Sequence, residues 1–157
     1  MNTRYTYLVD ISDLDKTWKS FDKEARYEIR KCGQEVKKTN DILLFDIMHS
    51  LTRPDREIGF WQILWWWITK RAQLYKTDRA MAMISHDKKR GYYLMAARLK
   101  INNDGSPSKI LWQVMKDLNA IGVKEFDMCG ANKPNIIQFK KQFGGKLVEQ
   151  ECPCLKY

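Results

Sequence analysis

Apolar residues recur with a helical period near the start of the chain. The spacing predicts one helix that begins at Ser12 or Asp13, either of which can cap it, and ends at Gly33. Four apolar residues form the buried stripe of this helix: Trp18, Phe21, Ala25 and Ile29.

Two further helices follow from the same period. One begins at Asn40 or Asp41 and ends near Pro54, because proline cannot continue the helical hydrogen-bond ladder. Its apolar residues are Leu43, Leu44, Ile47, Met48 and Leu51. The other helix is predicted over Glu57 to Tyr75. Its core face carries Phe60, Ile63, Leu64, Trp67, Ile68 and Leu74. Three tryptophans widen that face beyond one stripe: Trp61, Trp65 and Trp66.

Short alternating segments predict the strands of a sheet. The first two cover Tyr5 to Val9 and Gln34 to Lys38. Arg79 to Ser85 and Gly91 to Arg98 are also strand-like, and the polar turn Asp87-Lys88-Lys89-Arg90 between them predicts an antiparallel hairpin.

Helices and strands alternate in the rest of the chain. The predicted elements are a helix from Ser108 to Ala120, a strand from Glu125 to Met128, a helix from Pro134 or Asn135 to Gly144-Gly145, and a strand from Lys146 to Gln150. This alternation indicates an α/β or α+β sheet domain. Because no linker or repeat interrupts the pattern, we expect a single domain over residues 1–157.

Charge and composition narrow the class of partner. The chain has 28 Lys and Arg against 19 Asp and Glu, a formal charge of +9. A positive surplus attracts phosphate-bearing partners such as nucleic acid or nucleotides, but it does not identify a reaction. With 44% hydrophobic residues, the composition excludes a disordered polycation.

The sequence shows no clear targeting segment, and its cysteines do not predict a disulfide or a metal site. The longest apolar stretch, ILWWWI, is far shorter than the ~20 residues of a transmembrane helix, and the N-terminal residues do not resemble a signal peptide. We therefore expect a cytoplasmic protein. Its four cysteines are expected to be free thiols, since a chain of this size needs no disulfide. Cys152 and Cys154 lack a second pair of ligands, so no metal site is expected.

Two segments carry candidate chemistry. The Asn- and Gly-rich loop Asn102 to Pro107 precedes a helix, whose N-terminus, with Lys109 in its first turn, could bind an anion; the alternative is an ordinary capping loop. The segment Asp127 to Asn132 follows a strand, and strand ends in such sheets face the ligand site. Lys140 beside it could stabilise an oxyanion.

The aromatic residues have ordinary structural interpretations. Phe139 and Phe143 lie four positions apart on a helix, and Phe143 is expected in the core. The tryptophan cluster fits a core or an interface better than a lipid surface or a base-stacking site. Its excess apolar surface predicts self-association. The sequence supports no Ser-His-Asp or Cys-His triad, Walker loop or carboxylate pair.

A resemblance to a known family starts from the C-terminal segment AIGVKEFDMCGANKPNIIQFKKQFGGKLVE. It is similar to the closing segment of the Fem-type, peptidoglycan-bridge-forming branch of the GNAT acyltransferases, with a G-x-x-x-x-D-x-x-G stretch followed by F-K-x-x-F-G-G. The matching residues are Gly122, Asp127, Gly130, Phe139, Lys140, Phe143, Gly144 and Gly145. Looser similarities extend upstream, through Trp18 with Arg26, Arg30 and Lys31, through Thr52 to Phe60 and through Gly91 to Ala97.

The resemblance implies a GNAT-like mixed, mostly antiparallel sheet flanked by helices, and transfer of an acyl group to an amine. The co-substrate would be aminoacyl-tRNA or acyl-CoA, with no tightly bound cofactor and no metal. Lys140 would steady the tetrahedral intermediate and Phe139 would shape the site. Arg56 and Tyr93 would contact phosphates or sugar of the acceptor.

The chain departs from the family in two ways. Bridge-forming enzymes contain two tandem GNAT-like halves, and this chain has the size of one, so a second chain could complete the site. The family's small residues after the hairpin tyrosines are replaced by Met95-Ala96-Ala97-Arg98, which predicts a narrower and more basic groove. Arg98, Lys109 and Asn132 complete the expected substrate-binding set.

Two functions therefore follow from the sequence. The first is an acyltransferase that moves an aminoacyl group from tRNA, or an acyl group from CoA, onto an amine of a small molecule or peptide by direct attack. The alternative is a non-catalytic GNAT-like module that binds tRNA, another nucleic acid or a partner protein. Replacing Lys140 distinguishes them, since only the first loses turnover.

Overall fold

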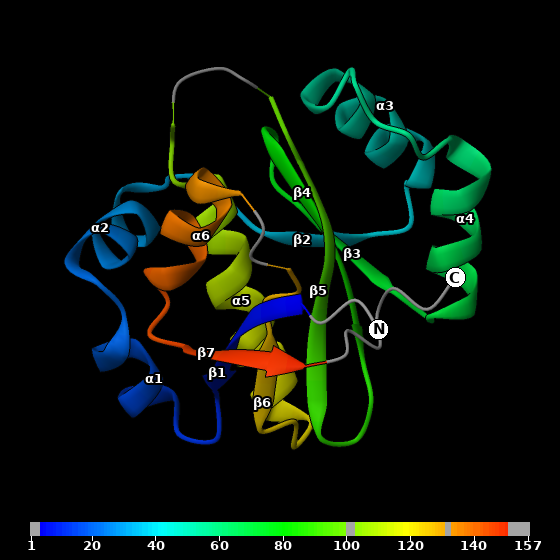
Figure 1. The fold of residues 1–157 in the computed structure, drawn as a ribbon. Helices are drawn as coiled ribbons and strands as arrows, with labels where there is room; N and C mark the ends of the chain where they lie inside the picture. The colour runs from blue at the N-terminus through cyan, green and yellow to red at the C-terminus, as the bar shows by residue number, and fades with distance from the viewer. Residues whose placement is uncertain (1–3, 100–102, 131–132, 151–157) are drawn as a thin grey trace.

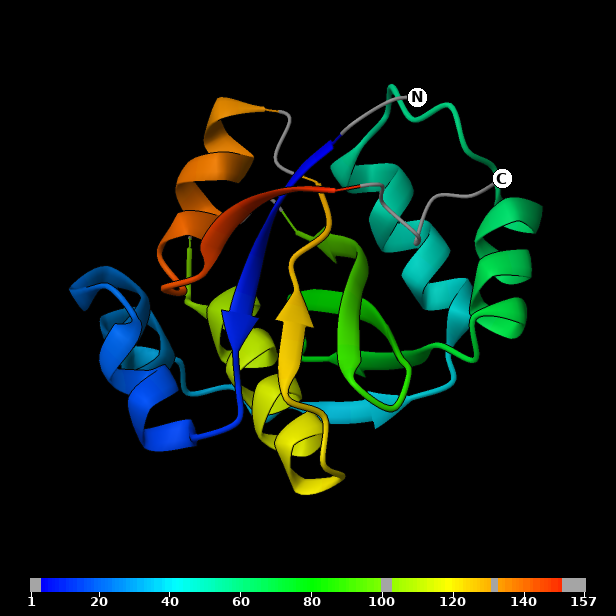
Figure 2. The ribbon, with the colours of Figure 1, turned by 60° about the horizontal axis from the view of Figure 1, so that its bottom comes forward.

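One mixed sheet organises the chain (Figure 1, Figure 2). The computed structural model describes residues 4–99, 103–130 and 133–150. Its strands are β1 (Arg4–Asp10), β2 (Lys37–Thr39), β3 (Gln73–Lys76), β4 (Ala80–His86), β5 (Arg90–Arg98), β6 (Glu125–Asp127) and β7 (Lys146–Gln150). They lie in the order β2-β3-β4-β5-β6-β1-β7, and all neighbours are antiparallel except β5 and β6. The predicted mixed, mostly antiparallel sheet is confirmed.

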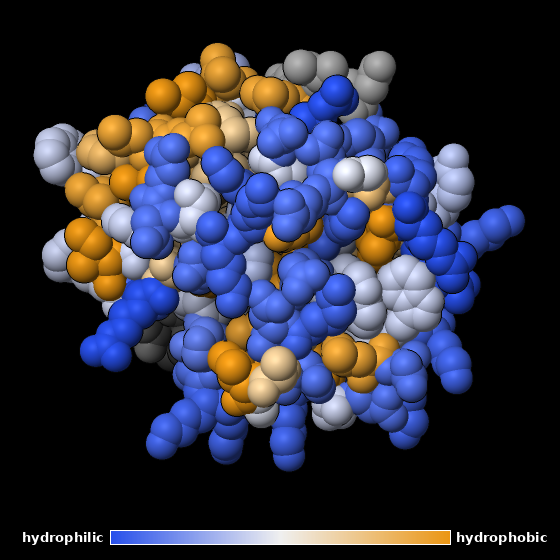
Figure 3. All heavy atoms as spheres, turned by 180° about the vertical axis from the view of Figure 1, so that it is seen from behind, coloured by the Kyte–Doolittle hydropathy of each residue, from blue (hydrophilic) through white to orange (hydrophobic). Residues whose placement is uncertain are grey.

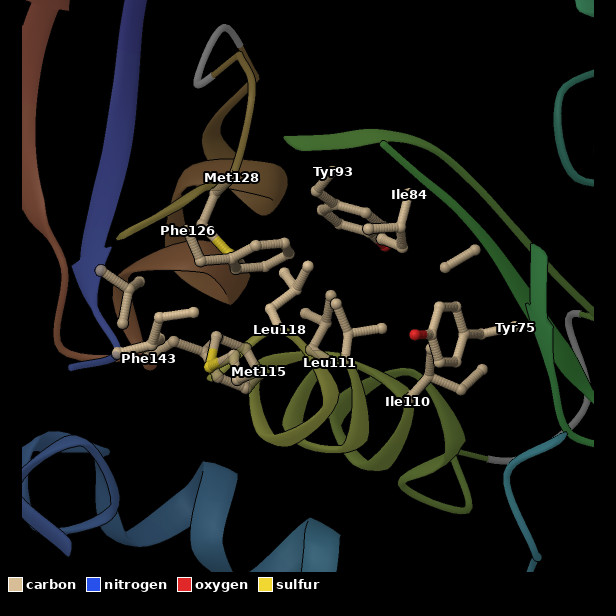
Figure 4. Packing of buried hydrophobic residues seen from close by; sticks show 14 of the residues in the cluster. Tyr75, Ile84, Tyr93, Ile110, Leu111, Met115, Leu118, Phe126, Met128 and Phe143 are labelled. Carbon is tan, nitrogen blue, oxygen red and sulfur yellow. The ribbon is translucent and has the colours of Figure 1, made fainter. Parts of the chain in front are cut away.

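In the part of the chain that the structure describes, six helices cover the two faces of this sheet. They are α1 (Leu14–Ser20), α2 (Lys23–Lys31), α3 (Ile42–Thr52), α4 (Phe60–Thr69), α5 (Ser106–Ala120) and α6 (Pro134–Lys141). The larger core cluster joins residues of α1, α2, α5 and α6 to one face, and the smaller cluster joins α3 and α4 to the other. Figure 4 shows Leu111 and Leu118 of α5 directed toward Tyr93 and Phe126 of the sheet.

The helix predicted from Ser12 or Asp13 to Gly33 is wrong as one element. It is broken at Phe21, which is extended and 2% exposed, and α2 begins after Asp22. The Asp22 N–H donates to the carbonyl of Gln142, which follows α6, so tertiary packing takes the chain out of the helix. The predicted cap is confirmed, because the Asp13 side chain accepts from two backbone N–H groups of α1.

The helix predicted over Glu57 to Tyr75 is also too long. It covers only Phe60–Thr69, since Arg71 has a left-handed φ of 48° and the chain then enters β3. Leu74 is buried, but in a strand between β2 and β4. Within α4, Ile68 was predicted on the core face but is 61% exposed, whereas Trp66 is buried. The strand predicted at 34–38 lies instead at Lys37–Thr39.

The pairing of β5 with β6 is short, and this positions the candidate site. It runs from Arg90 opposite Glu125 to Tyr92 opposite Asp127, where β6 ends. β5 continues to Arg98, paired with β4 on its other side. Tyr93 and the residues after Asp127 therefore lie where two parallel strands part, a position at which sheets commonly bind ligands.

Candidate active site

A strained turn follows β6. Cys129 and Gly130 both have left-handed backbone angles, with φ of 44° and 73°. Such a value is uncommon for a residue other than glycine and persists only where surrounding contacts impose it. Asp127 supplies two of those contacts: it is fully buried, and its Oδ1 accepts from the Thr6 hydroxyl at 2.5 Å and from the Cys129 N–H at 2.8 Å.

Lys140 of α6 closes this turn from the other side. Its side chain is buried, and Nζ donates to the carbonyl oxygens of Met128, Cys129 and Gly130, the last at 2.7 Å. An ammonium group has three donors, so these three carbonyls use all of them. A substrate oxygen can receive a hydrogen bond from Nζ only by displacing one of the three.

The electrostatics around Lys140 are unusual for a lysine. Burial lowers its pKa to about 8, and the positive charge of Arg53 acts in the same direction, whereas Cys129 and Asp127 favour the charged form. The Tyr93 ring lies 5.6 Å from Nζ in a cation–π contact. Burial also raises the pKa of the Cys129 thiol well above its usual value, so this thiol is a poor nucleophile at neutral pH.

Two exposed arginines belong to the same neighbourhood. The charges of Arg53 and Arg98 both act on the Tyr93 hydroxyl, whose pKa burial raises. Thr52, the last residue of α3, joins them: its hydroxyl accepts from the Arg98 N–H at 3.0 Å and lies 2.6 Å from the Arg98 carbonyl oxygen. Arg98 belongs to the set predicted from the sequence, whereas Arg53 does not, since its only sequence signal is its place between a helix end and Pro54.

Arg56 is engaged elsewhere. Its Nη1 donates to Asp46 Oδ1 at 2.7 Å, and both side chains of this ion pair are mostly buried. The same atom lies 3.4 Å from His49 Nδ1, and burial together with this arginine lowers the pKa of His49 to about 4. Among the described residues, no hydrogen bond or ion pair joins Arg56 to Lys140.

The two phenylalanines of the F-K-x-x-F motif differ in burial. Phe143 is fully buried in the larger core cluster, which confirms the prediction. Phe139 is half-buried and meets the Phe143 ring edge-on at 5.4 Å between centroids, next in sequence to Lys140. Asn132, the remaining residue of the predicted set, lies outside the described residues.

The N-terminus of α5, the predicted anion site, is lined by acidic side chains. Glu28 is buried there, and its carboxylate accepts from Asn103 Nδ2 and Ser108 Oγ, both at 2.6 Å. Asp104 accepts from the Ser106 N–H at 3.0 Å. A phosphate at this terminus would meet the carboxylate of Glu28 and that of Asp104, which also lies 3.8 Å from Arg79 in an ion pair.

Contacts between α2 and the start of α5 also involve two residues of the predicted anion site, Lys109 and Gly105. Lys109 donates to the carbonyl of Cys32, the residue that caps α2, at 2.7 Å. A Cβ on Gly105, whose φ is 79°, would lie 2.2 Å from the Glu28 carbonyl oxygen, so only glycine allows this approach. The loop before α5 is therefore fitted against α2.

Neither a metal cluster nor a membrane span occurs in the described part of the chain. Within residues 4–99, 103–130 and 133–150, no three His, Cys, Asp or Glu side chains are grouped so that they could hold a metal ion. No helix there is both long and apolar enough to cross a bilayer. Cys152 and Cys154 lie outside these residues, while Cys32 and Cys129 are thiols and not disulfides.

Comparison with known proteins identifies the fold. No protein family model matches the sequence, and no curated protein matches it. The structure of FemX matches with a TM-score of 0.80 at 15% identity, over 94% of this chain and 60% of FemX. L-PGS from Bacillus licheniformis matches with a TM-score of 0.61 at 13% identity, over 93% of this chain and 58% of that one. A protein of unknown function from Bacteroides thetaiotaomicron gives 0.68 at 10% identity, over 93% and 57%.

These likenesses establish a Fem-like GNAT fold. The chain spans about three fifths of the length of the structures that it matches.

Proposed function

We propose that this domain transfers an aminoacyl group from aminoacyl-tRNA to the amine of a small molecule or peptide. The observation that carries the proposal is Lys140: the fold resembles that of FemX, and a buried ammonium lies where β5 and β6 part. The motif F-K-x-x-F-G-G, by which the sequence resembles the Fem-type branch, contributes this lysine.

The chemistry is a direct acyl transfer. The acceptor nitrogen forms a bond to the ester carbonyl carbon, the tetrahedral intermediate carries the negative charge on its oxygen, and the ester C–O bond then breaks. The tRNA hydroxyl leaves with the proton that the amine gives up. A positive charge fixed beside the carbonyl oxygen favours the intermediate over the substrate. Lys140 supplies that charge, with Tyr93 and Phe139 at its sides.

The structure favours tRNA over acyl-CoA as the donor. Phosphates at the N-terminus of α5 would face Glu28 and Asp104. Arg53 and Arg98 are exposed instead on the side of Tyr93, and planar guanidinium groups suit phosphate recognition. We infer that these two arginines, in place of Arg56, contact donor phosphates near the reacting ester.

One observation favours the alternative of a non-catalytic binding module. All three donors of Lys140 are used by backbone carbonyls, an arrangement that a purely structural lysine would also adopt. A module of this kind would keep Arg53 and Arg98 for nucleic-acid contacts and would have no turnover.

A donor screen tests the proposal. The protein is incubated with tRNA charged with radiolabelled amino acids, and separately with labelled acetyl-CoA, together with candidate amines and small peptides. We expect label to move from tRNA to an amine and not from CoA. Transfer from CoA alone would overturn the choice of donor, and specific tRNA binding without transfer from either donor would support the binding module.

A further inference from the structure

Six exposed apolar side chains lie on the two helices α3 and α4, and they are here called the α3–α4 apolar face. Viewed from behind, apolar side chains gather on the part of the molecule where these helices lie (Figure 3). Its members, with their exposed fractions, are Leu43 62%, Ile47 55%, Leu51 62%, Trp61 78%, Trp65 65% and Ile68 61%. They recur every three or four positions, so each helix contributes one stripe.

The opposite sides of the same helices are already buried. Phe45 and Met48 of α3 and Ile63 of α4 pack in the smaller core cluster. Both helices are therefore apolar on their inner and their outer sides. A helix with this pattern is normally covered on both sides, and here the sheet covers only one.

The size of the face suits a protein interface. A tryptophan offers about 150–250 Å² of surface, so Trp61 and Trp65 together leave about 300 Å² exposed. Each of the four aliphatic side chains has a total surface of ~100 Å². When their exposed parts are added to those of the tryptophans, the exposed apolar area of the face is on the order of 500 Å². A standard interface buries ~800 Å² on each partner, including a polar rim. The apolar centre of such an interface is thus present.

The charge of the segment that contains α3 and α4 distinguishes an anionic partner from a second copy of this chain. Residues 41–71, which contain α3 and α4, carry four acidic and four basic side chains, so their formal charge is 4 − 4 = 0. The acidic ones are Asp41, Asp46, Asp55 and Glu57, and the basic ones are Arg53, Arg56, Lys70 and Arg71. The whole surplus of +9 lies outside this segment. An anionic lipid or nucleic acid gains little attraction here, whereas two uncharged faces of the same kind meet without repulsion.

We propose that the α3–α4 apolar face joins two copies of this chain in a symmetric dimer. A two-fold axis places the same residues on both sides of the interface, so each contact between the two stripes is made twice. Trp61 and Trp65 are the expected centre of the interface, since exposed tryptophans dominate binding when they become buried. The proposal does not depend on the transferase activity.

Sedimentation equilibrium with the whole chain tests this proposal. The comparison includes the double variant W61E/W65E and the control I121E, because Ile121 is 61% exposed at the far end of α5 and lies outside the face. We expect a dimer for the wild-type chain and for I121E. We expect W61E/W65E to weaken association by at least about 30-fold, since each tryptophan is an expected centre of the interface. The far-UV circular dichroism spectrum of W61E/W65E should match that of the wild type, because both side chains are exposed in the single chain. Its thermal unfolding should still be cooperative, at a temperature lowered only by the loss of the dimer.

Three outcomes would overturn the proposal: a monomer at 100 µM wild-type protein (roughly the scale of a weak complex), a dimer that persists in W61E/W65E, or equal dissociation of I121E. Vesicles of neutral and of anionic lipid serve as a further arm. Wild-type protein that stays monomeric but cosediments with either vesicle, with loss of binding in W61E/W65E, would assign the face to a lipid surface.

Discussion

The ammonium of Lys140 lies 5.6 Å from the centre of the Tyr93 ring, and the two residues come from elements that are separated in sequence by the whole of α5 and β6. This contact links the end of α6 to β5 at the point where β5 leaves β6. The ring and the three carbonyls together hold a positive charge inside the protein.

The Tyr93 ring, and not its hydroxyl, should matter for transfer. We expect Tyr93→Phe to keep kcat within about twofold, since the cation–π contact survives. Tyr93→Leu should lower kcat about fivefold, corresponding to ~1 kcal/mol for the contact. Steady-state kinetics on both variants, with thermal unfolding as a check of folding, measures this. Equal rates for Tyr93→Leu and wild type would remove Tyr93 from the site.

The pH dependence of transfer should report Lys140. Because the pKa of Lys140 is lowered to about 8, its charge is complete below that pH and is lost as the pH rises through it. A lysine that acts through its charge therefore gives a rate that declines above pH 8. The pH profile of Lys140→Arg should lack this decline, since arginine stays charged. A wild-type rate that continues to rise to about pH 9.5 would contradict a role for the charge.

Arg53 and Arg56 should have separable effects. Arg53→Ala and Arg98→Ala are expected to weaken tRNA binding and to reduce its salt dependence, because each removes a phosphate contact. Arg56→Ala should instead lower stability by about 3 kcal/mol, since it leaves the mostly buried carboxylate of Asp46 without its partner. Filter binding at several salt concentrations and urea unfolding make the comparison. Loss of tRNA binding in Arg56→Ala alone would reverse the assignment.

Glu28 should keep phosphate away from the N-terminus of α5. We expect Glu28→Ala to cost about 2–4 kcal/mol, because Ser108 and Asn103 lose a charged hydrogen-bond acceptor. Glu35→Ala, at an exposed position, should lower the free energy of unfolding by less than about 0.5 kcal/mol.

Calorimetry with pyrophosphate should detect no binding at the N-terminus of α5 in the wild-type chain. Binding that Ser108→Ala abolishes would show that the terminus is open to anions.

Local periodicity was sufficient for the regular part of the fold. The β4–β5 hairpin, α5 and the start of α6 were predicted because their apolar spacing and their turn residues agree. The break at Phe21 was missed because Phe21 itself continues the helical stripe, whereas the contacts found at the break, with Phe143 and between Asp22 and Gln142, are tertiary. The end of α4 was missed because Leu74 also fits a helical period, although it belongs to a strand.

The part of the candidate site that is continuous in sequence was the easiest to predict, while Tyr93 and Arg98 were assigned to it only through the family resemblance. Asp127 to Gly130 and Lys140 lie close together along the chain and share one motif. Arg53 joins them through Thr52 and Arg98, which are 46 positions apart, and no local pattern carries that contact. Glu28 is a similar case, since it reaches Ser108 across 80 positions.

Single-turnover transfer from aminoacyl-tRNA by Lys140→Met and Lys141→Met measures whether the buried lysine acts in catalysis. The two lysines are adjacent on α6, but Lys140 is buried at the site and Lys141 is exposed. We predict that Lys140→Met lowers the rate constant by at least about tenfold, and by more if a full oxyanion contact of ~2.7–4 kcal/mol is lost. Lys141→Met should match the wild type, and tRNA binding by both variants should stay within a few-fold. A folded Lys140→Met protein that transfers at the wild-type rate would contradict the account.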